Sequence, residues 1–210
     1  GRIEEIPALG NARNIAFWVV LLILVMALFQ LFSGNQTTMS SRRKIEELTF
    51  LDALTGVYNY RYLDRRLDEE LRIARRFHTT LSVIYMDLDK FKRINDEYGH
   101  QAGNSVLNQV GSFLKIGARE TDLVGRMGGD EFMMILPNTD RDEAQIVSER
   151  IRTRLEQHGF VTGDGKTEHI AVSMGVASFP FESEDKEGLV SCADQAMYRA
   201  KQSGGNRVCI

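Results

Sequence analysis

The chain has 210 residues, of which 43% are hydrophobic and 26% are charged, and its formal net charge is -3. This length is enough for one domain with a sizeable core plus an appendage. The slight acidity excludes the bulk basic field that nucleic-acid-binding proteins use, so we expect no nucleic-acid partner. Cys192 and Cys209 fit no metal or disulfide pattern and suit a reducing compartment.

The first element is an unbroken apolar run, Ile15 to Phe29, which "QLF" extends to Phe32. As a helix this run spans about 27 Å, close to the hydrocarbon core of a bilayer at about 30 Å. A signal peptide is the alternative, but its apolar region is usually shorter, and a buried core helix would need a polar face. The sequence therefore predicts an N-terminal flank at 1–14 and a transmembrane helix at 15–33.

Flanking charges indicate the orientation of this segment. Before it lie Arg2 and Arg13 with Glu4 and Glu5, and after it lie Arg42, Arg43 and Lys44. The basic excess of one residue favours a cytoplasmic carboxyl side. We therefore expect a single-pass membrane protein whose carboxyl-terminal domain lies in the cytoplasm.

The stretch "GNARNIAFWVVLLILVMALFQLFSG" also resembles the first transmembrane segment of bacterial membrane-anchored ATP-dependent zinc proteases. That resemblance implies the opposite orientation, and both a fusion and a chance likeness remain open. The sequence has neither a G-x-x-x-x-G-K-[ST] nor an H-E-x-x-H motif, so no protease function transfers.

Residues 34–47 read as a polar linker and the start of a short connecting helix over 45–54, whose apolar residues recur every three positions. Such a narrow apolar stripe either pairs with a second copy of the chain or packs on its own domain. The domain itself is predicted at 48–210.

Later elements follow from periodicity and from turn signals. Residues 59–78 form an amphipathic helix, 81–89 a buried strand, 104–118 a helix, 122–127 and 131–137 a hairpin, 140–159 a helix, 169–180 a strand, 187–205 a helix and 206–210 a closing strand. From the first core strand the order is β-α-β-β-α-β-α-β. This order predicts an α/β (α+β) domain with a mainly antiparallel central sheet flanked by helices.

The predicted hairpin carries the most informative chemistry. Gly128 and Gly129 allow a tight turn and the close approach of an anion, and Asp130 and Glu131 follow directly. The strand "VIYMDLD" ends in Asp87 and Asp89. If the two strands are neighbours, Asp87 and Asp130 converge, and converging carboxylates need a cation such as Mg²⁺ on a nucleoside triphosphate. The alternative is a solvated acidic hairpin tip.

"GGDEF", "DALTGVYN", "DLDKFKRINDEYGHQAGN" and "ADQAMYRAKQSGGN" together resemble the GGDEF family of diguanylate cyclases from about residue 48 to 210. The resemblance implies a fold like the palm of nucleotide cyclases and polymerases. It implies that two domains meet as a homodimer, each holding one GTP, and make cyclic di-GMP with two Mg²⁺ or Mn²⁺ ions per active site.

Roles follow from the resemblance by position. Asp87, the carbonyl of Leu88, Asp130 and Glu131 would hold metal, with Asp130 as the catalytic acid. Lys92 would offset phosphate charge, with Gly128 and Gly129 at the substrate. Asn95 and Asn104 would face guanine, with His100 beside the substrate, and Lys201 would contact the terminal phosphates.

The chain departs from the family pattern at two of these places. Gly205 stands where the family usually has a phosphate-gripping arginine, and Arg207 is the candidate replacement. Asn104 stands where the family usually has Asp. An amide can pair with guanine or adenine, whereas a carboxylate only accepts hydrogen bonds.

"RETD", Arg119 to Asp122, matches the family's inhibitory product site in its placement just before the hairpin. Arginine offers a planar fork to guanine or phosphate, and aspartate accepts from guanine N–H groups. The leading interpretation is thus a membrane-anchored diguanylate cyclase under product inhibition. Its rivals are a cyclase that also makes cyclic GMP–AMP and a non-catalytic cyclic di-GMP receptor.

Overall fold

The computed structural model describes residues 17–19, 21–26, 50–162 and 165–210 of the chain. The chain divides into two units, Gly1–Thr49 and Phe50–Ile210, and each is described by itself. In the first unit, residues 17–19 and 21–26 are helical and exposed. Among the described residues, none of the helices combines the length and the apolar character that a bilayer crossing requires. The predicted span at 15–33 and the linker at 34–47 lie mostly outside the described residues, so both stay predictions.

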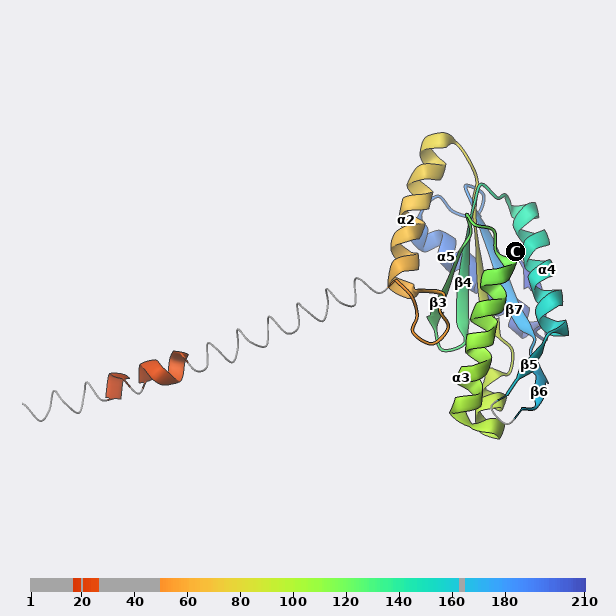
Figure 1. Cartoon of the computed structure of the whole chain (residues 1–210). Coiled ribbons are helices and arrows are strands. Elements are labelled where there is room, and N and C mark those ends of the chain that lie inside the picture. Colours follow the sequence, from red (N-terminus) through yellow and green to blue (C-terminus); the bar gives the residue numbers. More distant parts are fainter. Residues whose placement is uncertain (1–16, 20, 27–49, 163–164) are drawn as a thin grey trace, which may run out of the picture. The chain divides into compact units, whose positions relative to one another are not determined.

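The second unit is built on a six-stranded mixed sheet (Figure 1). Across the sheet its strands are β1 (Tyr58–Asn59), β3 (Leu123–Gly128), β4 (Glu131–Pro137), β2 (Leu81–Leu88), β7 (Val172–Phe179) and β8 (Val208–Cys209). The four central strands pair antiparallel, as predicted, whereas β1 on β3 and β8 on β7 pair parallel. Strand β2 lies at the middle of the sheet and is buried along its whole length.

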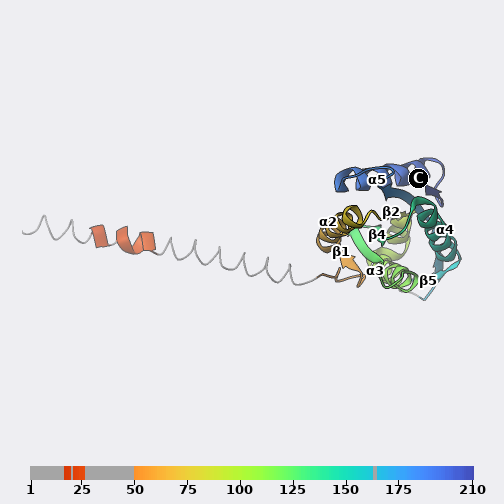
Figure 2. The same ribbon diagram turned by 90° about the horizontal axis from the view of Figure 1, so that it is seen from above.

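Helices cover both faces of this sheet (Figure 2). They are α2 (Tyr60–Phe77), α3 (Phe91–Gly117), α4 (Arg141–Gln157) and α5 (Lys186–Gln202). Buried side chains of α3 and α4 form one core with Ile84, Phe132 and Met134 of the sheet. Those of α2 and α5 form a second core with Val83, Met133 and Ile135. Each buried leucine or isoleucine contributes about 1.5–3 kcal/mol, so these two layers stabilise the domain.

Side-chain caps fix where the helices begin. The side chain of Asn59 accepts from the N–H of Tyr62 at the start of α2. Asp140 and Glu143 form a reciprocal capping box at the start of α4. Asp185 caps α5 by accepting from the N–H of Gly188. Such caps satisfy N–H groups that have no partner within the helix.

Helix α5 lies unusually close to strand β7 because of Gly175. A Cβ atom added there would fall 1.9 Å from the carbonyl oxygen of Ala193 and 2.2 Å from the nitrogen of Met197. The backbone of α5 therefore rests directly on the backbone of β7.

Three local predictions were wrong. The helix predicted over 45–54 is absent from Phe50 onward, where Leu51 bridges Tyr58 and a turn follows, and 45–49 lie outside the described residues. In that turn Asp52 Oδ1 accepts from both the N–H and the hydroxyl of buried Thr55, which replaces helical hydrogen bonding.

Helix α3 begins 13 residues earlier than the predicted start at 104, with a break at Gly99 where φ is 81° and ψ is 162°. No element was predicted between the helix 140–159 and the strand 169–180, yet a small hairpin of β5 (Gly159–Val161) and β6 (Thr167–His169) lies there.

Candidate active site

Strand β2 and the β3–β4 hairpin meet at one end of the sheet. Asp87 is the cross-strand partner of Glu131, so both side chains lie on the sheet face that α2 and α5 cover. Asp130 occupies the turn, and its carbonyl accepts from the N–H of Leu88 at 3.4 Å. The predicted neighbourhood of the two strands is confirmed, and it brings Asp87, Asp130 and Glu131 to one edge.

Asp87 is the electrostatic centre of this edge. Its side chain is only 10% exposed, and its Oδ2 lies 2.6 Å from the Nζ of Lys201 on α5. Burial raises the pKa of Asp87 to about 6, the charge of Asp130 adds to the rise, and the hydrogen bond from Lys201 opposes it. The other oxygen, Oδ1, is buried without a hydrogen-bond partner. A buried carboxylate oxygen without a partner is open to a further hydrogen-bond donor or to a cation.

Glu131 is held by a tyrosine. Its Oε2 accepts from the hydroxyl of Tyr85, two residues before Asp87 on β2, at 3.2 Å. Burial and the charge of Glu131 raise the pKa of Tyr85 above its ordinary value, so the phenol stays protonated and donates. Sequence reasoning missed Tyr85, although its place two residues before Asp87 puts it on the same face of the strand.

These residues fit a divalent cation through Asp87. Carboxylate and carbonyl oxygens are the ligands that Mg²⁺ prefers. Within residues 17–19, 21–26, 50–162 and 165–210, no three His, Cys, Asp or Glu side chains already converge as a ligand cluster. The fit therefore rests on Asp87 Oδ1 and on the neighbouring acids, with Lys201 as the present counter-charge.

The hairpin tip depends on its glycines and on Arg126. Gly128 has φ of 154° and Gly129 has φ of 52°, and the second is a left-handed value that favours glycine. Arg126 donates to the carbonyl of Gly129 from Nε at 3.0 Å and from Nη2 at 2.6 Å. Its Nη1 also lies 3.2 Å from Asp52 Oδ1. One guanidinium thus ties the acidic turn to the loop that precedes β1, a link that sequence reasoning missed.

The four predicted substrate residues on α3 lie around its break at Gly99. Lys92 is exposed on the first half of the helix, and His100 and Asn104 are exposed on the second. Asn95 is half-buried and lies over Gly103, where an added Cβ would meet its Oδ1 at 2.0 Å. Asn95 therefore lies against the second half of the helix, at the residue before Asn104. No hydrogen bond joins these four residues to Asp87, Asp130 or Glu131 in the part of the chain that the structure describes.

The loop after α5 completes the site. Gly205 has φ of 75°, and a Cβ there would lie 2.9 Å from Asp89 Oδ2, so an arginine in this conformation would be strained and crowded. Arg207 instead donates from Nε to the carbonyl of Gly205 at 3.2 Å. Asp89 accepts from the hydroxyl of Ser173 and the N–H of Asn206, both at 2.7 Å. Of the two acids at the end of the strand, Asp89 is thus used to hold this loop.

Arg119 and Asp122 form a turn beside a separate pocket. Asp122 Oδ2 accepts from the N–H of Arg119 at 2.8 Å, while Asp122 Oδ1 is buried without a partner. The pocket has a volume of about 280 Å³, and Val57, Tyr58, Lys115, Glu120 and Val124 are among its other lining residues. The predicted R-x-x-D pair therefore borders a cavity that is distinct from the acids of the hairpin.

Comparison with known proteins decides the family. A family model described as "Diguanylate cyclase, GGDEF domain" matches residues 49–207. The chain belongs to the GGDEF domain family. The matched residues include every predicted site position, from Asp87 to Lys201.

Two curated relatives of this GGDEF chain come from bacteria. It is 34% identical over 198 residues to "Uncharacterized protein YhcK" of Bacillus subtilis, covering 94% of this chain and 55% of that protein. It is 38% identical over 167 residues to "Diguanylate cyclase A" of Treponema denticola, covering 78% of this chain and 45% of that protein. The chain thus spans about half the length of these relatives.

A solved structure supports the fold of this GGDEF domain. The GGDEF domain of DgcB from Caulobacter crescentus, in complex with c-di-GMP, is 32% identical with a TM-score of 0.71. The similarity covers 76% of this chain and 92% of that chain. This match supports the predicted α/β fold, with a mixed sheet flanked by helices.

Proposed function

We propose that this chain is a diguanylate cyclase, which condenses two GTP molecules into cyclic di-GMP. The 3′-hydroxyl of each GTP attacks the α-phosphate of the other. Two new phosphodiester bonds form, two bonds between the α- and β-phosphates break, and two pyrophosphates leave. The single observation that carries the proposal is the buried, half-partnered carboxylate of Asp87 beside a hairpin that presents Asp130 and Glu131. The relative named Diguanylate cyclase A supports the same reaction.

The proposed reaction uses divalent metal ions as its cofactor. Asp87, the Leu88 carbonyl, Asp130 and Glu131 would hold two Mg²⁺ or Mn²⁺ ions. When bound, such ions lower the pKa of a coordinated hydroxyl and offset the charge of phosphates. Tyr85 keeps Glu131 oriented toward this edge through its hydrogen bond.

The remaining residues bind and orient GTP. Lys201 would exchange its ion pair with Asp87 for the terminal phosphates, because a metal on Asp87 removes the charge that now attracts it. Lys92 and Arg207 would add positive charge on the same side. Asn95 and Asn104 would read the base, with His100 beside it.

Assembly and location follow from the reaction and from the first unit. One domain that holds one GTP needs a second copy, so we propose a homodimer at the moment of catalysis. We also propose that residues 15–33 anchor the chain in the bacterial inner membrane as a single span, with the GGDEF domain in the cytoplasm.

Product inhibition would act at the pocket beside Arg119. The unpartnered Oδ1 of Asp122 suits the N–H donors of guanine. We expect Arg119→Ala to weaken inhibition by cyclic di-GMP without lowering the initial rate, since the pocket is distinct from the acids. Inhibition curves of variant and parent that overlay would show that this pocket is not the inhibitory site.

The proposed function is tested by incubating the full chain with GTP and Mg²⁺ and identifying products by mass spectrometry. We expect cyclic di-GMP and pyrophosphate from the parent, and a loss of at least about a hundredfold in rate for Asp130→Asn. Asp142→Asn, the same neutralisation of an exposed acid at the start of α4, is the control. If the parent makes no cyclic dinucleotide, or if Asp130→Asn turns over normally, the proposal is wrong.

A further inference from the structure

The loop after α5 has an unusual backbone. Three successive residues have positive φ: Gly204 at 110°, Gly205 at 75° and Asn206 at 49°. Asparagine tolerates this left-handed conformation better than most residues, but other contacts must still hold it in place. The first contact is the Asn206 N–H to Asp89 Oδ2 at 2.7 Å, which ties the loop to the end of β2.

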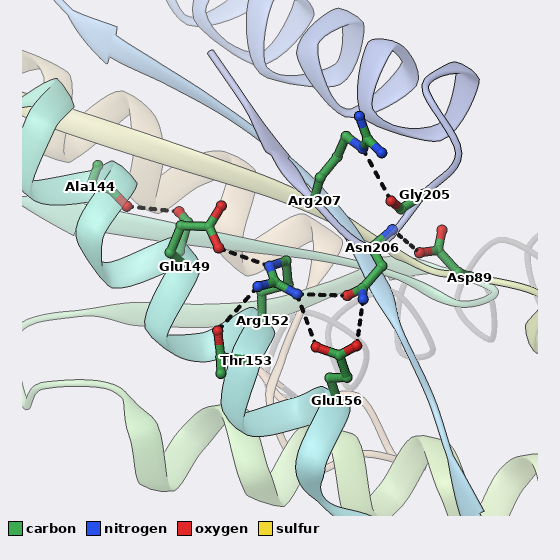
Figure 3. A network of polar contacts seen from close by, with 10 residues as sticks. Asp89, Ala144, Glu149, Arg152, Thr153, Glu156, Gly205, Asn206 and Arg207 are labelled. Carbon is green, nitrogen blue, oxygen red and sulfur yellow. Dashed lines mark hydrogen bonds and ion pairs between the residues drawn. The ribbon is translucent and has the colours of Figure 1, made fainter.

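A second contact comes from α4, on the opposite face of the sheet from α5 (Figure 3). Arg152 Nη1 donates to Asn206 Oδ1 at 2.9 Å, and Asn206 Nδ2 donates to Glu156 Oε1 at 2.7 Å. Arginine only donates and glutamate only accepts, so this pair fixes which way the amide of Asn206 points.

Arg152 is itself oriented on α4. Its Nε donates to Glu149 Oε2 at 2.8 Å, and its Nη1 lies 3.1 Å from Glu156 Oε2. The side chain of Arg152 is 18% exposed, whereas those of Glu149 and Glu156 are 45% and 47% exposed. Its Nη2 also donates to Thr153 Oγ1 at 3.2 Å. Four polar contacts on one largely covered guanidinium restrict it far more than a single surface ion pair would.

The clamped loop joins the two cations on the phosphate side of the candidate site. Lys201 lies just before it and pairs with Asp87, and Arg207 follows it and folds back on the Gly205 carbonyl. Val208 of β8 pairs with Met174 of β7, so Arg207 lies opposite Ser173. Ser173 in turn pairs with Asp87, which places Arg207 and Asp87 on the same face of the sheet. A shift of the loop therefore moves both cations.

We infer that Arg152 is a positioning residue for the phosphate side of the nucleotide site, and that it acts through the side chain of Asn206. The inference rests on the proposed function as far as the nucleotide is concerned. The base-facing residues Asn95 and Asn104 lie on α3, away from this loop, and the β2–β4 ladder holds Asp87 independently. Arg152 therefore sets affinity for the triphosphate and leaves affinity for the base unchanged.

The test measures binding without turnover. The full chain is titrated calorimetrically with Mg²⁺ and a GTP analogue that cannot be cleaved between the α- and β-phosphates, and GMP is the competing ligand. We expect Arg152→Met to weaken binding of the analogue about tenfold and to leave GMP unchanged. Arg152→Lys, which keeps a donor for Asn206, should recover part of this loss. Arg154→Met is the control, since it removes the same charge from an exposed position on α4.

A double-mutant cycle tests the route through Asn206. Asn206→Gly keeps the left-handed backbone and removes the side-chain contacts. If Arg152 acts through Asn206, the Arg152→Met/Asn206→Gly pair should bind the analogue no more weakly than the worse single variant. Additive losses, equal losses for GMP, or an equal effect of Arg154→Met would each overturn the inference.

Two checks separate a failure of this inference from misfolding and from a failure of the proposed function. Melting temperatures are measured for every variant, and if Arg152→Met does not fold, Arg152→Lys and Asn206→Gly carry the same comparison. A parent that binds the analogue but makes no cyclic dinucleotide would contradict the proposed function and leave the positioning test intact. A parent that binds neither nucleotide would overturn both.

Discussion

At position 104 the chain carries an amide, exposed on the second half of α3. An amide can accept from the N1–H of guanine, and it can also donate to N1 of adenine. The unpaired buried polar groups that normally penalise the wrong base would therefore cost less here. If Asn95 and Asn104 both face the base, as proposed, base choice depends on two amides.

We expect some cyclic GMP–AMP from equimolar ATP and GTP in the presence of Mg²⁺. Asn104→Asp should restrict the product to cyclic di-GMP, because a carboxylate cannot donate to adenine. Product ratios by mass spectrometry measure the effect, and Asn108→Asp, one turn further along α3, is the control. Absence of any mixed dinucleotide from the parent would mean that Asn104 is a tolerated variant.

The ion pair of Lys201 with Asp87 leads to a second prediction about a single residue. The pKa of Asp87 is about 6, because burial raises it and the hydrogen bond from Lys201 opposes part of that rise. Lys201→Met should therefore raise the pKa of Asp87 further in the metal-free chain, whereas the exposed control Lys92→Met should not. Carboxyl ¹³C NMR during a pH titration measures both. A pKa that stays the same or falls in Lys201→Met would contradict this account of the site.

Among the elements, the β3–β4 hairpin is held from outside by Arg126, which joins the Gly129 carbonyl to Asp52. Burial raises the pKa of Asp52, but hydrogen bonds from Thr55 and the charge of Arg126 outweigh it and the net shift is downward. Because the folded pKa lies below the unfolded one, ionised Asp52 stabilises the fold above about pH 4. That contribution is lost as the pH falls through the lowered value.

Asp52→Asn keeps an oxygen for Thr55 and removes the charge that faces Arg126. We expect it to lower the free energy of unfolding by at most about 1 kcal/mol at pH 7, and the difference to shrink as the pH falls below about 4. Urea unfolding at several pH values checks this, with Asp96→Asn on α3 as an exposed control. A difference that persists unchanged at pH 3 would mean that the charge of Asp52 is not responsible.

The order of the main strands and helices was predictable because their local periodicity is visible in the sequence. The buried run of β2, the glycine turn of the hairpin and the apolar stripe of α2 are all readable from neighbouring residues. The first half of α3 was overlooked, although Phe91, Ile94 and Tyr98 have helical spacing. The loop at 50–57 was misread because a side chain, Asp52, replaces the helical hydrogen bonds of Thr55.

The candidate site likewise contains residues that the sequence predicted and contacts that it did not. Asp87, Asp130 and Glu131 were predicted because they lie at strand ends whose pairing could be guessed. The contacts of Arg126 with Asp52, and of Arg152 with Asn206, join residues 74 and 54 positions apart. Such pairs depend on how the elements pack, and no local pattern in a single sequence contains that information.

At the scale of the whole molecule, the proposed reaction needs two GGDEF domains, because each carries a single set of acids. Specific activity of the full chain should therefore rise with enzyme concentration across a dilution series, as the dimer population follows mass action. Initial rates are compared with the sedimentation of the same samples. A constant specific activity together with a sedimenting monomer would contradict catalysis between two copies.

Gly175 has a consequence for how this domain tolerates change. It carries no chemical group, yet α5 rests on it at Ala193 and Met197, one helical turn before Lys201. Even the single methyl of alanine would have to lift the helix and carry Lys201 away from Asp87. A random-mutagenesis screen for loss of function should thus recover this glycine as often as the acidic residues themselves. Surveys restricted to side chains near the nucleotide would never sample it.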